Sequence, residues 1–174
     1  MVMTDVMMDR RHAALREYRA RSLAERHFHG LTATAVATCA DACSTAALFA
    51  ALEPTFMLQF PRAKEAQHAQ RLVEALRAAV VSGSVRSLVV CGHVDCQLSL
   101  ECTEERVEAG RRSLLVQCAA LYEDASLGPL LRSGRVALLP LLFDEDAGDV
   151  FSLHPVSRAL VLMSDPEVLA ALAR

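Results

Sequence analysis

Two short stretches of this chain carry side chains that could bind a metal ion and do chemistry on it. The first is Cys39-Ala40-Asp41, and the second, over fifty residues later, is His93-Val94-Asp95-Cys96. Together they offer two thiols, an imidazole and a carboxylate. That is a complete set of ligands for one tetrahedral zinc ion.

Each stretch directly follows an apolar run that is typical of a β-strand. These runs cover residues 32–38 and 85–91, and the second is almost continuously hydrophobic, as expected for a strand covered on both faces. In open α/β sheets, ligands bind outside the carboxyl ends of parallel strands. Two such strands in one sheet would therefore bring Cys39, His93 and Cys96 to one point.

The rest of the chain alternates between strand and helix patterns. We expect helices over residues 9–29, 44–52, 64–81 and 104–122, a turn or short helix over 125–131, and a last helix from 165. Strands are expected over residues 32–38, 55–60, 85–91 and 134–143, with an acidic turn at 144–149 and an antiparallel edge strand at 150–153. This pattern predicts a single α/β domain over residues 1–174: a mainly parallel four-stranded sheet with an antiparallel edge strand, flanked by helices.

Composition narrows the class of protein. Of 174 residues, 53% are hydrophobic and 22% are charged, which indicates a globular chain, and the formal net charge of -3 gives no reason to expect nucleic acid. No stretch approaches the ~20 apolar residues of a membrane span, and the first nine residues do not resemble a secretory signal. We therefore expect a cytoplasmic protein that needs no membrane. In a reducing compartment the six cysteines favour metal binding or burial over disulfides, and Cys91 and Cys118 are predicted to be core residues.

The two stretches resemble motifs of the β-class carbonic anhydrases. Cys39-Ala40-Asp41-Ala42-Cys43 is similar to the family's Cys-x-Asp-x-Arg, and Gly92-His93-Val94-Asp95-Cys96-Gln97 to its Gly-His-x-x-Cys-Gly. The resemblance covers roughly residues 10–155 and implies a β-carbonic anhydrase-like fold.

The same resemblance implies a function and a set of roles. Cys39, His93 and Cys96 would bind Zn2+, whose hydroxide attacks CO2 and gives bicarbonate, while Asp41 would orient that hydroxide as the catalytic residue. The helical arm over residues 1–30 would reach across a partner subunit, which implies a homodimer.

The chain also departs from the family at three places. One is Gln59-Phe60-Pro61-Arg62-Ala63, where the family has a polar, glycine-containing stretch at the end of its second strand. Cys43 stands where the family has the arginine that holds the aspartate off the metal, and Gln97 replaces a glycine. Cysteine cannot supply a bidentate cationic fork, so Asp41 is expected to spend more time on zinc as a fourth ligand and to close the site. Alternatively, Arg62 takes over the aspartate, or Cys43 itself coordinates zinc.

Three functions therefore follow from the sequence. The first is reversible hydration of CO2 by a zinc-dependent enzyme. The second is a non-catalytic relative whose zinc, capped by Asp41, stabilises the fold. The third keeps the zinc chemistry but acts on another small heterocumulene, such as carbonyl sulfide or carbon disulfide.

Overall fold

A computed structural model describes residues 33–39, 56–60, 65–94, 103–144, 147, 149–154 and 157–163 of the chain. Within these ranges the helices are α3 (Glu65–Val81), α4 (Thr103–Glu123) and α5 (Leu127–Arg132). The strands are β1 (Thr34–Cys39), β2 (Phe56–Phe60), β3 (Ser87–His93), β4 (Ala137–Asp144), β5 (Asp149–Leu153) and β6 (Leu160–Leu162). The helices expected over residues 9–29, 44–52 and from 165 lie outside the described residues.

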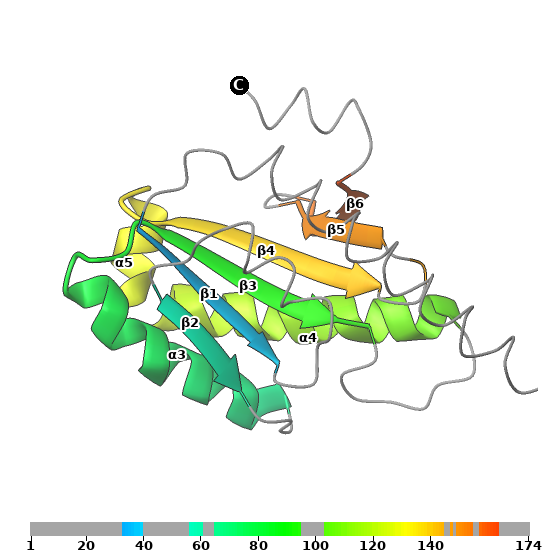
Figure 1. The fold of residues 1–174 in the computed structure, drawn as a ribbon, viewed down its shortest axis with the longest axis horizontal. Coiled ribbons are helices and arrows are strands. Elements are labelled where there is room, and N and C mark those ends of the chain that lie inside the picture. Colours follow the sequence, from blue (N-terminus) through cyan, green and yellow to red (C-terminus); the bar gives the residue numbers. More distant parts are fainter. Residues whose placement is uncertain are drawn as a thin grey trace, which may run out of the picture.

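The strands form one six-stranded sheet in the order β2-β1-β3-β4-β5-β6. The pairs from β2 to β4 are parallel, and β5 and β6 are antiparallel (Figure 1). The predicted α/β class and the mainly parallel sheet are confirmed, and β5 is the expected antiparallel strand. Strand β6 was not predicted, because three residues are too few to show an alternating pattern.

Both faces of the central strand β3 are buried, as its continuous hydrophobicity predicts. Leu88 and Val90 belong to the core cluster shared with the helices, whereas Val89 and Cys91 point to the opposite face. None of the four is more than 4% exposed. A strand buried on both faces leaves its ends as the places where polar side chains can meet a ligand.

Helices α3 and α4 cover the same face of the sheet (Figure 1). α3 links β2 to β3, and α4 with α5 links β3 to β4, so both crossovers run in the same direction across the sheet. Right-handed crossovers in the same direction must lie on the same face. The helices bury Leu72, Leu76, Leu114 and Leu121 completely against it. None of the helices within the described ranges is long and apolar enough to cross a membrane.

Asp124 joins the helical layer at the turn between α4 and α5. One carboxylate oxygen accepts a hydrogen bond from Nη2 of Arg77 in α3 at 2.6 Å. The other accepts the backbone N–H groups of Ser126 and Leu127 at 2.9 and 2.8 Å, which satisfies donors at the start of α5. These contacts lower the pKa of Asp124 below its usual value, with the Arg77 hydrogen bond as the largest cause.

Replacing this carboxylate is expected to loosen the helical layer. Asp124→Ala should lower the free energy of unfolding by about 1–3 kcal/mol at neutral pH, because it removes both the cap and the ion pair. Since the pKa of Asp124 is lowered in the folded state, this contribution is fully present above about pH 4. It disappears as the pH falls through the lowered pKa.

Urea unfolding of both proteins at several pH values measures the effect. Asp124→Asn is the matched control, because it keeps an oxygen for the cap and loses the charge. It should be destabilised less than Asp124→Ala. An equal difference between wild type and Asp124→Ala at neutral and strongly acidic pH would contradict the role of the charge.

Candidate metal centre

The carboxyl ends of β1 and β3 lie side by side in the sheet. β1 ends at Cys39 and β3 ends at His93, and the two strands pair in parallel through Thr38 opposite Cys91. The chain leaves β1 toward β2 on one side, while β3 is followed by β4 on the other. The gap between β1 and β3 is therefore the topological switch point, where ligands bind in open α/β sheets.

Both strands extend further along the chain than the sequence predicts. Cys39 and His93 were expected just after their strands, but each is the last residue of its strand. β3 is extended because His93 still pairs with Phe143 of β4, and the N–H of Val94 donates to the carbonyl of Phe143 at 2.8 Å. The imidazole is thus attached to the rigid sheet and not to a loop.

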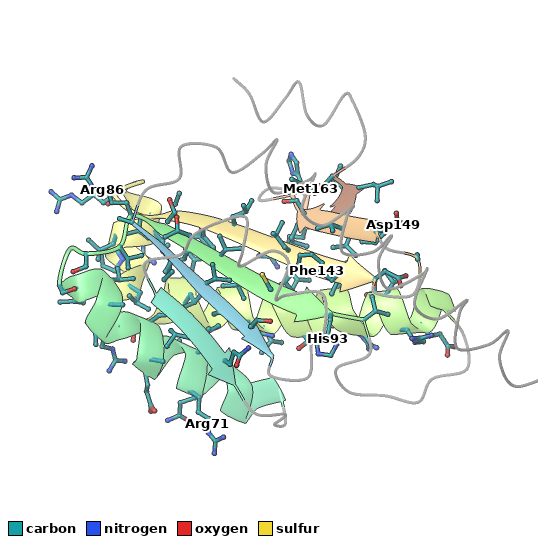
Figure 2. The ribbon with its side chains drawn as sticks, in the orientation of Figure 1. Arg71, Arg86, His93, Phe143, Asp149 and Met163 are labelled. Atoms are coloured by element: carbon teal, nitrogen blue, oxygen red, sulfur yellow. The ribbon has the colours of Figure 1, made fainter. Side chains whose placement is uncertain are left out.

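His93 carries an unsatisfied polar atom in the protein interior. Figure 2 shows the residue at the end of β3. It is 5% exposed, and its buried Nε2 has no hydrogen-bond partner among the residues that the structure describes. Leaving a buried nitrogen unpaired costs about 1–3 kcal/mol. An imidazole nitrogen is also a common zinc ligand. The orphaned Nε2 therefore fits a metal ligand better than it fits an ordinary core histidine.

Gly92 lets the neighbouring elements close against this strand end. A Cβ at Gly92 would lie 3.3 Å from Cδ1 of Leu142, and a Cβ at Gly110 of α4 would lie 2.8 Å from the same atom. The Leu142 side chain is completely buried. It fills the space between the end of β3 and α4 because both facing residues lack a side chain.

Other expected ligands lie outside the described residues. Asp41 and Cys96 belong to this group, as do Cys43 and Arg62. Among the residues that the structure does describe, no group of three His, Cys, Asp or Glu side chains could hold a metal ion. The set of Cys39, Asp41, His93 and Cys96 as zinc ligands therefore stays a prediction.

Asp144 was expected in a solvated acidic turn, and that interpretation was wrong for this residue. It is the last residue of β4 and only 6% exposed. Its Oδ1 accepts the N–H of Ala147 at 3.0 Å. Because Phe143 pairs with His93, Asp144 lies at the same end of the sheet. Only the strand pairing reveals this position, since the local sequence reads as a turn.

The predicted core cysteines are confirmed. Cys91 and Cys118 are free, buried thiols. Burial raises the pKa of each to about 12. Because the thiolate is the form that binds metals, these two side chains are packing residues at neutral pH.

Comparisons with known proteins agree with this architecture. No protein-family model matches the chain, and no curated protein matches it. Among solved structures, the β-carbonic anhydrase CcaA is 17% identical, with a TM-score of 0.57, covering 90% of this chain and 99% of its own.

Two fungal proteins resemble this chain in structure to a similar degree. A tetrameric β-carbonic anhydrase from Sordaria macrospora is 11% identical with a TM-score of 0.53, covering 71% of this chain and 81% of its own. The β-carbonic anhydrase CafD of Aspergillus fumigatus is 15% identical with a TM-score of 0.51, covering 71% and 90%. Sheet order, crossovers and these likenesses together show that the chain has a β-carbonic anhydrase-like fold.

Proposed function

We propose that this chain is a zinc-dependent protein that hydrates CO2 reversibly to bicarbonate. The observation that supports it most is the buried Nε2 of His93, which is unpaired within the described ranges of the chain. It lies at the switch point of the sheet, next to the strand that ends at Cys39. An orphaned imidazole nitrogen at a ligand-binding edge has a physical reason to exist if a metal ion binds it.

The proposed ligands are Cys39, His93 and Cys96. Two thiolates and a neutral imidazole balance the charge of Zn2+ and leave one coordination position open. Zinc in such a site lowers the pKa of bound water to roughly 7 and so supplies a nucleophile at neutral pH. The sheet holds His93 in place through its pairing with Phe143, so the imidazole needs little reorganisation when the metal binds.

Asp41 is proposed as the residue that would accept a hydrogen bond from the attacking hydroxide and orient it. Its usual arginine partner is absent, because position 43 is a cysteine. An unpaired carboxylate next to Zn2+ is attracted to the metal. This substitution favours a second candidate function, in which Asp41 caps the zinc and the protein binds the metal without catalysis.

The proposed assembly is a homodimer acting on CO2 and bicarbonate in the cytoplasm. The predicted helical arm over residues 1–30 supports the dimer through the family resemblance. Neither nucleic acid nor a membrane is a proposed partner.

Substituting His93 tests the metal proposal without any assay of activity. His93→Leu removes the buried orphan nitrogen, so the metal-free variant should unfold at a urea concentration no lower than metal-free wild type. Zinc at 100 times its dissociation constant should stabilise wild type by about 2.7 kcal/mol. It should add no such stability to His93→Leu.

His154→Ala is the matched control, because it removes an exposed histidine outside the proposed metal site. It should keep the full zinc effect. Equal stabilisation of wild type and His93→Leu by zinc would show that His93 is not a ligand.

Hydration of CO2 by zinc-loaded wild-type protein is expected to rise with pH, because deprotonation creates the nucleophile. Stopped-flow measurement on protein of known zinc content gives the rate. Full zinc occupancy without hydration at any pH would rule out the catalytic proposal and leave the capped metal.

The cysteine at position 43 provides a separate test of the capping account. Cys43→Arg should raise the hydration rate about ten-fold or more, because a guanidinium can pair with Asp41 and hold it off the metal. Cys43→Ala is the control and should leave both the rate and the zinc content unchanged. Loss of zinc in Cys43→Ala would instead identify Cys43 as a ligand.

A further inference from the structure

A concave surface lies between α4 and the antiparallel end of the sheet. Its volume is about 490 Å³, which falls within the range of roughly 300–1,000 Å³ for small-molecule sites. Its lining from β4 is Leu138, Leu139 and Pro140, in the first half of that strand. His93 pairs with Phe143 in the second half, so this groove is separate from the candidate metal centre.

The wall and floor of the groove are mostly apolar. Leu115 and Cys118 come from α4, and Leu138 and Leu153 come from the sheet. Burial raises the pKa of the Cys118 thiol to about 12, so it is uncharged at neutral pH. Covering this apolar surface with an apolar ligand lowers the free energy, because water is removed from both.

Arg158 brings a positive charge to the groove from the loop before β6. Its φ of 57° lies in the left-handed region, which is unfavourable for arginine. The backbone is held there by two contacts: its N–H donates to the carbonyl of His154 at 2.9 Å, and Nη1 of Arg111 donates to its carbonyl at 3.1 Å. Within the described part of the chain, the Arg158 guanidinium forms no ion pair.

The other end of the groove is negative. Glu123 lines it and is the last residue of α4, where the helix terminus adds a partial negative charge. Arg111 lies on the same helix as Glu123, and its Nη1 donates to the carbonyl of Arg158. At 1.5 Å per residue, Arg111 and Glu123 are roughly 18 Å apart along the axis. The groove therefore has a cationic end and an anionic end, with apolar surface between them.

We propose that this groove binds a small organic acid with one carboxylate and an apolar body. The carboxylate pairs with the guanidinium of Arg158, which offers a fork of donors to its two oxygens. The apolar body covers Leu115, Leu138 and Leu153. A second carboxylate on a ligand of this length would lie against the apolar surface and lose its hydration, so a monoacid binds better than a diacid of the same length.

Isothermal titration of zinc-loaded protein with octanoate tests the proposal. Octanoate should bind at one site, whereas 1-octanol, with the same chain length and no charge, and octanedioate should bind at least about ten-fold more weakly. In amide NMR spectra, octanoate should shift the signals of Leu115 and Leu138 and leave that of His93 in place.

A variant at the cationic end tests the contribution of the Arg158 charge. Arg158→Asn keeps the loop, because asparagine tolerates the left-handed region, and should weaken octanoate binding about ten-fold or more without lowering Tm. Arg112→Gln removes an exposed arginine of α4 outside the groove and should bind octanoate as wild type does.

Three results would overturn the proposal. The first is the absence of saturable octanoate binding. The second is octanoate binding that Arg158→Asn leaves unchanged, as a carboxylate bound at the metal centre would do. The third is concentration-dependent self-association through the groove that octanoate does not reverse, since a second copy of the chain would then be the occupant.

Discussion

The parallel pairing of β1 with β3 is the constraint on which the rest of the structure depends. Parallel neighbours need crossover connections, and those crossovers place α3 and α4 on one face of the sheet. Side chains on the opposite face of β3 are buried as well. The strands can then carry almost only apolar residues along their length. The strand ends are left for polar side chains, and Cys39 and His93 lie at two of these ends.

Two polar side chains in different parts of the molecule differ in how many hydrogen-bond partners they have. Asp124 is surrounded by donors from Arg77, Ser126 and Leu127, so its charge stabilises the helical layer. The Nε2 of His93 has no hydrogen-bond partner in the described part of the chain. The unpaired nitrogen lowers the stability of the fold, because its desolvation is not offset by a hydrogen bond. Function is the usual reason for such a site.

Helix α4 runs from the end of β3 that carries His93 to the groove. Its first half lies against Leu142 through Gly110, close to the end of β3 that carries His93. Its second half forms the wall of the groove with Leu115 and ends at Glu123. One rigid helix thus supports the candidate metal centre and the proposed acid site without the two sharing a residue.

The sequence by itself determined the α/β class, the central buried strand and the core positions of Cys91 and Cys118, because hydrophobic periodicity and continuous apolar runs are local signals. Zinc ligation by Cys39, Asp41, His93 and Cys96 rests on motif resemblance and stays a prediction. Only the tertiary structure decided that His93 ends a strand with an orphaned nitrogen, that Asp144 is buried, and that Arg158 faces an apolar groove. These features depend on strand register and on contacts between residues far apart in the chain, which no local pattern contains.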